Sequence, residues 1–423
     1  MQTSLRGIAD KAARHKKYRF RNLFGMLNEE YLISCWSFLN PKASPGVDQV
    51  DAREYGKNLA GNVMGLVDVV KRGSYRARLV LRKYIPKING KMRPLGIPAI
   101  ADKLLQTGAH RILESIYEAD FLACSYGYRR GRGSHDAIRD LSAVLVGGCY
   151  KFIVEADIKG FFDNISHEWL LRMLELRIDD KPFLRLIRKW LKAGVLDQGK
   201  VIRPEAGTPQ GGSVSPILAN VYLHYALDIW FEKVVKAHCR GRSAIWRYAD
   251  DFVCAFEFKE DAEWFYQELG PRLKKFELEL AEDKTNLIRF IPEGDKGPKP
   301  SFEFLGFEFR WGLSRWGKPT LKRRTSRQKY RSSLANFRVW SKENRNLPLR
   351  LLFGKLNSKL RGYYNYYGLR YNSKCLWDFL YQTERILFKW INRRSQRKSY
   401  NWKGFKQLLE EFKVPRPRIA ADF

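Results

Sequence analysis

Hydrophobic and polar positions follow two different periods along this chain. Three segments carry apolar residues at helical spacing, namely residues 18–40, 101–117 and 262–280. Three other segments are rich in β-branched and aromatic residues, as strands are, namely residues 79–98, 151–158 and 245–256. This mixture predicts an α+β fold over the first 310 residues.

Two of the strand-like segments are predicted to fold as hairpins. Residues 79–98 contain Asn89-Gly90, a strong signal for a tight turn, with basic residues around it that are either solvated or laid on phosphates. Residues 245–256 place Asp250 and Asp251 at the turn between two apolar runs. Two adjacent carboxylates repel one another, and a bound Mg²⁺ would offset that repulsion because it prefers oxygen ligands. Acidic residues are also common in solvated turns, so the pair alone leaves both interpretations open.

A third carboxylate strengthens the metal interpretation. Asp157 ends the strand predicted at residues 151–158. A strand-terminal Asp and a hairpin Asp pair are the components of a site that holds two metal ions for phosphoryl transfer. Between them, residues 205–220 form a Gly- and Pro-rich loop that could present backbone N–H groups to a nucleotide. Ser215-Pro216 is predicted to start the next helix, with Ser215 as its cap.

From residue 311 the pattern becomes helical, and two or three amphipathic helices are predicted to pack as a bundle. The charge changes at the same position. Residues 311–423 contain 28 Lys and Arg against 6 Asp and Glu, whereas the whole chain contains 78 against 45 and carries a formal charge of +33. The C-terminal part is therefore the more strongly attracted to anions.

A charge excess of this size indicates a polyanionic partner. Nucleic acid is the leading candidate, and an anionic membrane surface is the alternative. The 12 Trp, 21 Tyr and 26 Phe favour nucleic acid, because bases stack on aromatic rings. No apolar run is long enough to span a bilayer. The six scattered Cys include no CxxC pair, which argues against a zinc ribbon and favours free thiols in a reducing compartment.

Seven segments together resemble the group II intron-encoded reverse transcriptases and maturases, and they occur in the order of that family. The segments are RPLGIP (93–98), SYGYRRGRG (125–133), ADIKGFFDNISH (156–167), GTPQGGSVSPILAN (207–220), RYADD (247–251), EDKT (282–285) and FLGFEF (304–309). The resemblance covers residues 18–310 and, more loosely, residues 311–418. It implies a right-hand polymerase whose fingers and palm contain a central antiparallel sheet. The implied domains are an N-terminal extension (1–84), fingers and palm (85–310), and an all-α basic thumb and maturase domain (311–423).

The resemblance also implies roles for individual residues. Asp157, Asp250 and Asp251 would be catalytic and hold two Mg²⁺ ions, which activate the primer 3′-hydroxyl and neutralise the triphosphate. Five residues would contact the deoxynucleoside triphosphate: Lys87 and Arg93 on the finger hairpin, Phe162 as the block to a ribose 2′-hydroxyl, Gln210 and Lys284. Six basic residues are expected to contact nucleic acid: Arg129, Arg132, Arg323, Arg324, Arg327 and Lys329.

The implied function is an RNA-directed DNA polymerase that also assists splicing of its own intron. Its partners would be an RNA template, a DNA primer, deoxynucleotides and group II intron RNA, in the bacterial cytoplasm at the nucleoid. Two alternatives stay open: a free-standing reverse transcriptase of phage defence, CRISPR adaptation or DNA repair, and an RNA-binding splicing cofactor without polymerase activity. Many family members also carry a C-terminal DNA-binding segment and an HNH-type endonuclease. Neither is seen in this sequence, so second-strand target cleavage is not expected.

Overall fold

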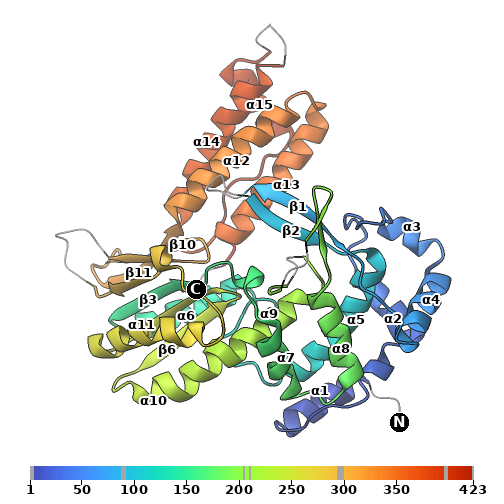
Figure 1. Cartoon of the computed structure of the whole chain (residues 1–423). Helices are drawn as coiled ribbons and strands as arrows, with labels where there is room; N and C mark the ends of the chain where they lie inside the picture. Colours follow the sequence, from blue (N-terminus) through green and yellow to red (C-terminus); the bar gives the residue numbers. More distant parts are fainter. Residues whose placement is uncertain are drawn as a thin grey trace. The chain divides into compact units, whose positions relative to one another are not determined.

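The computed structural model describes residues 4–86, 92–202, 205–208, 211–292, 300–394 and 399–421 (Figure 1). The chain divides into two compact units, each built from several segments. The first contains Met1–Gly133, Ala156–Phe252 and Glu263–Thr285, and the second contains Ser134–Glu155, Val253–Ala262 and Asn286–Phe423. No helix among the described residues combines the length and the apolar character needed to cross a membrane.

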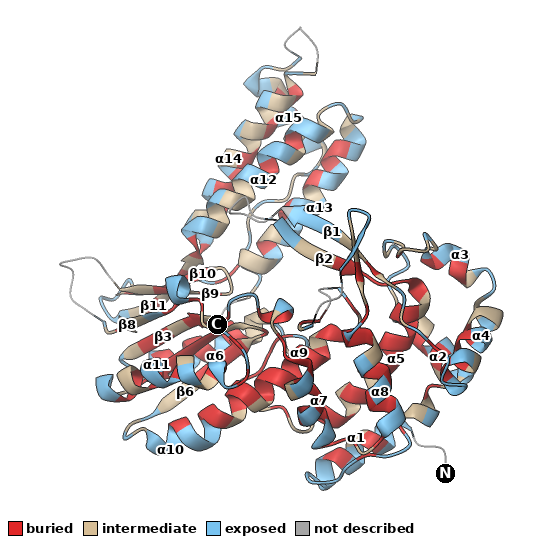
Figure 2. Cartoon of the chain, viewed as in Figure 1, coloured by how far each residue is buried: buried red, intermediate tan, exposed pale blue. Residues whose placement is uncertain are grey.

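Helix α5 is the centre of the first unit. It spans Ile100–Tyr117, as the sequence predicts, and it is buried on almost every side (Figure 2). Its buried residues include the polar Asp102, Lys103, Gln106 and Thr107 as well as apolar side chains, so neighbouring elements enclose most of its surface. Four neighbours pack against it: α1 (Leu5–Arg14), α2 (Glu29–Trp36), α4 (Leu59–Lys71) and α9 (Ser215–Leu223). The unit also contains α3 (Ala52–Gly56), α7 (His167–Glu175), α8 (Lys181–Leu191) and α10 (Lys236–His238).

The predicted finger hairpin is present. Strand β1 (Val80–Pro86) pairs antiparallel with β2 (Met92–Ile97), from Leu81 opposite Ile97 to Pro86 opposite Met92. The turn residues Asn89-Gly90 and the predicted site residue Lys87 lie outside the described residues. The sheet continues through β4 (Val195–Asp197), which runs parallel to β1, to β5 (Lys200–Ile202) in the order β2-β1-β4-β5.

A second four-stranded sheet carries Asp157 and Asp251 at strand ends and Asp250 in the connection between two of its strands. Its order is β6-β7-β3-β8, formed by β6 (Ser243–Tyr248), β7 (Asp251–Phe256), β3 (Phe152–Asp157) and β8 (Asn286–Arg289). Phe252–Phe256 is buried without interruption, as expected for an internal strand. Helix α6 (Ser134–Val146) follows the motif SYGYRRGRG in the chain, and helix α11 (Lys259–Lys274) follows β7.

The second unit combines a small sheet with a helical bundle. The sheet order is β11-β10-β9, formed by β9 (Ser301–Phe304), β10 (Phe307–Leu313) and β11 (Pro319–Thr325). The helices are α12 (Arg327–Asn344), α13 (Leu349–Tyr367), α14 (Ser373–Ile391) and α15 (Trp402–Glu411). Their buried positions recur at helical spacing and form one apolar core, while basic residues occupy outward positions (Figure 2).

The structure corrects four sequence predictions. The alternation of FLGFEF predicts one continuous strand with Gly306 inside it, but the segment is a hairpin, because Leu305 and Gly306 adopt φ of +51° and +80° and separate β9 from β10. The helical pattern begins at Arg327 rather than at residue 311, since β10 and β11 occupy residues up to Thr325. The predicted helix at 18–40 shrinks to a short 3₁₀ turn at Phe24–Met26 and α2. Ser215 is the first residue of α9, whose cap position is Val214.

Candidate active site

The fold brings Asp157 and the Asp250-Asp251 pair to neighbouring strands of one sheet. Strand β3 ends at Asp157, β7 begins at Asp251, and Asp250 lies in the two-residue connection between β6 and β7. The three side chains are half-buried. The predicted hairpin with its turn at the acidic residues is confirmed.

The turn of this hairpin contains a residue in an unfavourable backbone conformation. Ala249 adopts a φ of +58°, a left-handed conformation that costs an L-residue roughly 1–2 kcal/mol. Gly127, from the motif SYGY, packs directly against it. A Cβ added to Gly127 would lie 2.5 Å from the backbone nitrogen of Ala249 and 3.1 Å from the carbonyl carbon of Tyr248. Glycine is therefore required at position 127 by close approach to the acidic turn.

Charges at the turn are mutually coupled. Burial raises the pKa of the Asp250 carboxyl, and the neighbouring charge of Asp157 raises it further, while Arg93 and Lys284 oppose the change. The Lys284 ammonium donates a hydrogen bond to Oδ2 of Asp157, and this bond raises the pKa of Lys284. Lys284 sits in a short 3₁₀ turn (Glu282–Lys284), which is held to the end of β3 by the bond from Ala281 N–H to the Asp157 carbonyl, 2.8 Å. The structure thus brings four of the predicted site residues together.

The donor set fits a divalent cation through two carboxylates. Asp157 and Asp250 offer hard oxygen ligands, and their mutual repulsion is the kind that such an ion relieves. Across the described ranges, no group of three or more His, Cys, Asp and Glu side chains is placed so that it could hold a metal ion. The participation of Asp251 as a third ligand therefore stays a prediction.

The phenol of Tyr128 lies close enough to Asp250 to interact with its charge, and the ring of Phe162 lies beside that of Tyr128. Phe162 lies in the 3₁₀ turn Phe161–Asp163 that follows β3, and its ring meets that of Tyr128 edge-on at 6.4 Å between centroids. Tyr128 has a φ of +59° and is 44% exposed, so a constrained backbone presents a partly open ring beside the site. Burial raises the pKa of the Tyr128 phenol, with a further contribution from the charge of Asp250.

The loop with the motif GTPQGG packs against two other motifs, ADIKGFFDNISH and RPLGIP. Gly207 has a φ of +92°, and a Cβ there would lie 2.7 Å from the carbonyl oxygen of Asp163. Thr208 N–H donates to the Phe162 carbonyl at 2.8 Å, which ties the loop to the aromatic turn. A Cβ on Gly211 would lie 2.4 Å from the carbonyl oxygen of Gly96 in β2. The predicted nucleotide-contacting residue Gln210 lies outside the described residues of this loop.

Comparison with known proteins agrees with this arrangement. Residues 85–309 match the family described as reverse transcriptase (RNA-dependent DNA polymerase). Residues 331–408 match the group II intron maturase-specific domain. The chain belongs to the group II intron reverse transcriptase/maturase family. Its right-hand α+β polymerase fold, with a helical C-terminal region, is that of the family.

Individual relatives support the same assignment. The group II intron-encoded protein LtrA of Lactococcus lactis subsp. cremoris is 31% identical over 77% of this chain, which spans 66% of that relative's length. Protein YkfC of Escherichia coli K12 is 32% identical over 78% of this chain and 94% of its own length. A telomerase from Candida albicans aligns with 86% of this chain and 66% of its own at 15% identity and a TM-score of 0.46, too low to add to the assignment.

The predicted nucleic-acid contacts divide into buried and accessible side chains. The Arg129 side chain is 5% exposed, and it binds the Glu118 carboxylate and the carbonyls of Leu122 and Ser125. Arg323 is 3% exposed and donates to the Ser142 hydroxyl at 3.2 Å. Burial and internal acceptors favour a structural role for these two guanidiniums, and their contact with nucleic acid stays a prediction.

The other four basic residues keep some exposure. Arg132 donates to the Ala123 carbonyl at 2.6 Å, and Arg324 is paired with the Glu308 carboxylate at 2.7 Å. Arg327, at the start of α12, is exposed and Lys329 is half-buried. Contact of these four with RNA stays a prediction.

Two features of the site were missed from the sequence. Tyr128 borders the carboxylates, and its position in the motif SYGY was the available signal. Arg247 is fully buried in β6, two residues before Ala249 of the acidic turn. A charged residue inside an otherwise apolar strand was the signal there, because such a residue needs internal partners.

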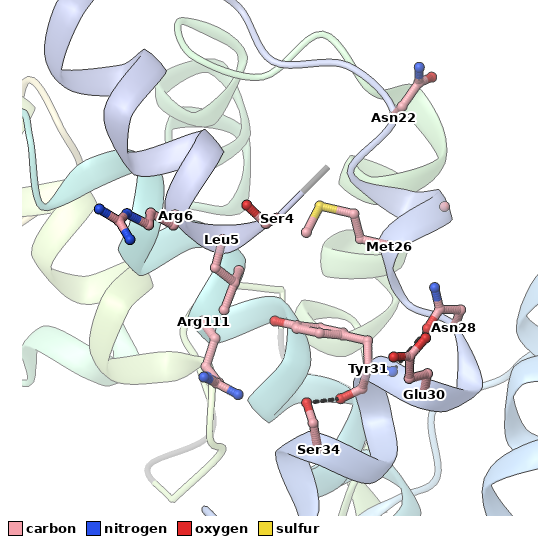
Figure 3. A pocket seen from close by; sticks show the side chains of 11 residues that line it. Ser4, Leu5, Arg6, Asn22, Met26, Asn28, Glu30, Tyr31, Ser34 and Arg111 are labelled. Carbon is pink, nitrogen blue, oxygen red and sulfur yellow. Dashed lines mark hydrogen bonds between the residues drawn. The ribbon is translucent and has the colours of Figure 1, made fainter. Parts of the chain in front are cut away.

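A separate cavity of about 690 Å³ lies in the N-terminal segment of the first unit (Figure 3). Its lining includes the side chains of Arg6, Met26, Tyr31 and Arg111, which Figure 3 shows around the hollow. Tyr31 donates to the Gly108 carbonyl at 2.9 Å, so it belongs to the packing of α2 on α5. None of the predicted catalytic carboxylates lines this cavity.

Proposed function

We propose that this protein is an RNA-directed DNA polymerase that copies an RNA template into cDNA by two-metal nucleotidyl transfer. The observation that carries the proposal is the coupled cluster of Asp157, Asp250, Lys284 and Arg93 at the end of β3 and the β6–β7 turn. Two neighbouring carboxylates suit divalent cations and two neighbouring cationic side chains suit phosphate, which supports the proposal. Family membership supports the same chemistry.

Each residue has a definite task in this proposal. Asp157 and Asp250, with Asp251 as the third carboxylate, hold two Mg²⁺ ions, which activate the primer hydroxyl and neutralise charge on the triphosphate and pyrophosphate. Arg93 binds the triphosphate, together with Lys87. Lys284 keeps positive charge beside Asp157 and Asp250, because a lysine ammonium is protonated at neutral pH and the hydrogen bond to Asp157 raises its pKa further.

Sugar and base selection are assigned to the elements next to the carboxylates. Phe162 is 6% exposed and immobilised by Phe161 and Tyr128, so it forms a rigid wall where a ribose 2′-hydroxyl would project. Gln210, in the loop fitted against Phe162 and Gly96, is proposed to lie by the nascent base pair.

We infer a second function, binding of group II intron RNA to assist splicing and mobility. The match of residues 331–408 to the maturase-specific domain favours it. The basic excess after residue 311 supplies the charge that RNA phosphates require. A free-standing role in phage defence, CRISPR adaptation or DNA repair would keep the polymerase chemistry and change the RNA partner.

Primer extension on poly(rA)/oligo(dT) with dTTP and Mg²⁺ tests the polymerase proposal. Wild type should extend the primer, Asp250→Asn should not, and Asp68→Asn, at an Asp on α4 whose side chain is 48% exposed, should behave as wild type. Extension by none of the three, with tight RNA binding retained, would instead favour a splicing cofactor without polymerase activity.

The RNA partner is tested separately. A group II intron RNA flanking the gene should splice faster in the presence of the protein, and Asp250→Asn should keep this effect. Failure to accelerate splicing, in a protein that extends primers, would favour the free-standing role.

A further inference from the structure

Arg247 makes an unusually complete set of contacts for a buried charge. The residue is 0% exposed in β6, and each of its five N–H groups has an acceptor. Nε and Nη2 donate to the two carboxylate oxygens of Asp228 at 2.7 and 2.6 Å, and Nη2 also donates to the Ser125 hydroxyl at 2.8 Å. Nη1 donates to Oδ1 of Asn220 at 3.1 Å and to the Ala249 carbonyl at 3.0 Å. The guanidinium therefore joins three stretches of the chain: Ser125, the helical stretch with Asn220 and Asp228, and the turn at Ala249.

One of these contacts reaches the acidic turn itself. Ala249 is the left-handed residue directly before Asp250, and its carbonyl accepts from Arg247. This bond closes the turn from inside the protein and fixes the peptide plane that leads into Asp250. Because a left-handed alanine is intrinsically unfavourable, surrounding contacts must determine its conformation.

A second set of contacts holds the turn from the other side. The Asn220 amide nitrogen donates to the Gly127 carbonyl at 2.7 Å, and Gly127 packs against the Ala249 nitrogen. Backbone bonds from Tyr126 N–H to the Arg247 carbonyl (2.9 Å) and from Arg247 N–H to the Cys124 carbonyl (2.8 Å) continue this attachment. The turn is thus held between the SYGY segment and the buried guanidinium.

We propose that Arg247, paired with Asp228 and Asn220, is a positioning residue that fixes the Ala249-Asp250 turn in the geometry needed to bind the catalytic metal ions. We call Arg247, Asp228 and Asn220 the turn clamp. The proposal rests on the polymerase function proposed above and assigns to this site residues that touch neither substrate nor metal.

The first unit contains a matched buried arginine that does not touch the turn. Arg177 is 3% exposed, pairs with the Asp120 carboxylate at 2.9 Å, and donates to the carbonyls of His15 (2.9 Å) and Ala12 (3.2 Å). It thus holds the C-terminal end of α1. The pair Arg177–Asp120 has the chemistry of the turn clamp without its location, so Arg177→Lys is a control for the general effect of altering a buried ion pair.

Lysine at position 247 tests the clamp. Its ammonium keeps the positive charge beside Asp228, but three donors at one point cannot span Asp228, Asn220 and the Ala249 carbonyl together. Hydrogen exchange over the segment Ile245–Phe256 should accelerate about tenfold or more in Arg247→Lys and stay at the wild-type rate in Arg177→Lys. Primer extension should fall by about 10²-fold, because a displacement near 1 Å at a catalytic group has an effect of that size.

The dependence on Mg²⁺ separates positioning from simple loss of stability. Arg247→Lys should need several-fold more Mg²⁺ for half-maximal extension, whereas Arg177→Lys should keep the wild-type requirement even if both lose thermal stability. If Arg247→Lys does not fold, Asn220→Ala decides, since it removes one acceptor of Arg247 and the bond to Gly127 without leaving a buried charge unpaired. It should show the same changes at smaller size.

The outcomes are distinct. The turn-clamp proposal is overturned if a folded Arg247→Lys or Asn220→Ala variant shows the same hydrogen exchange and Mg²⁺ dependence as Arg177→Lys while the wild-type enzyme is active. Wild-type protein that extends no primer counts against the polymerase proposal instead, and the exchange comparison then still shows whether the turn depends on Arg247.

Discussion

The contact between Gly127 and the acidic turn offers the most direct test of the site. In Gly127→Ala the new Cβ would lie 2.5 Å from the Ala249 nitrogen, whereas ordinary van der Waals contact begins at 3.4 Å. The two backbones must therefore separate by about 0.9 Å, and neither neighbour is a flexible side chain that could give way. The displaced residue, Ala249, is adjacent to Asp250.

The magnitude follows from that displacement. A shift near 1 Å at a reacting group lowers a rate by about 10²-fold, so kcat for primer extension should fall between about 30- and 100-fold. Overpacking of this kind also lowers the free energy of unfolding by about 1–3 kcal/mol. The assay is steady-state extension of oligo(dT) on poly(rA) at saturating dTTP, with the melting temperature measured on the same preparations.

Gly131→Ala is the matched control in the same loop. Gly131 has a φ of +68° and nothing within 4 Å of an added Cβ, so alanine there strains the backbone without pushing on the turn. It should lower the melting temperature and leave kcat within about twofold of wild type, because no catalytic group moves. A Gly127→Ala enzyme with wild-type kcat, or two variants with equal losses, would refute the reasoning.

Four further predictions concern other parts of the molecule. Asp250→Asn should lower extension by at least about 10³-fold with RNA affinity unchanged, because the loss is confined to charge stabilisation at the transition state; an equal loss of RNA affinity would argue for misfolding. Phe162→Ala should raise incorporation of ribonucleotides relative to deoxynucleotides by roughly 10–200-fold, measured by single-nucleotide competition, and an unchanged ratio would place the sugar elsewhere. Burial lowers the pKa of His110 and His224 to about 4 each, below the value of about 6.5 in the unfolded chain, so their contribution to stability is full above about pH 6.5 and is lost as the pH falls towards 4. At pH 5 each histidine should lower the free energy of unfolding by about 2 kcal/mol. The variant His224→Gln should therefore reduce the difference in melting temperature between pH 7 and pH 5. Arg327→Ala should reduce the slope of log affinity for RNA against log salt by about 1, whereas Arg323→Ala should lower the melting temperature and leave the slope unchanged; equal slopes for the two variants would remove Arg327 from the interface.

The sequence by itself determined the local elements and the order of the motifs. Alternation and turn residues located the finger hairpin and the β6–β7 hairpin, because strand period and turn chemistry are local properties. The apolar run before Asp157 located β3 for the same reason. The sequence also led to the chemistry proposed for the site, since a strand-terminal Asp with an Asp pair in a hairpin turn is typical of two-metal sites.

The local sequence pattern did not predict the structure where one kind of sequence is compatible with two secondary structures. The alternation of FLGFEF fits one strand or two, and only left-handed backbone at Leu305 and Gly306 makes the hairpin. Residues 311–325 are rich in basic residues like the helices that follow, yet they pair as β10 and β11 because Leu321, Arg323 and Thr325 face the interior at a period of two.

Tertiary structure alone decided which charged residues serve the site and which serve the fold. Arg129 and Arg323 have the sequence context of RNA contacts, but long-range packing buries them against internal acceptors. The sequence around Arg247 is that of a strand, and only the folded chain brings Asp228, Asn220 and Ser125 into contact with its guanidinium. Burial and partners depend on segments up to 122 residues apart in the chain, and no local pattern encodes that proximity.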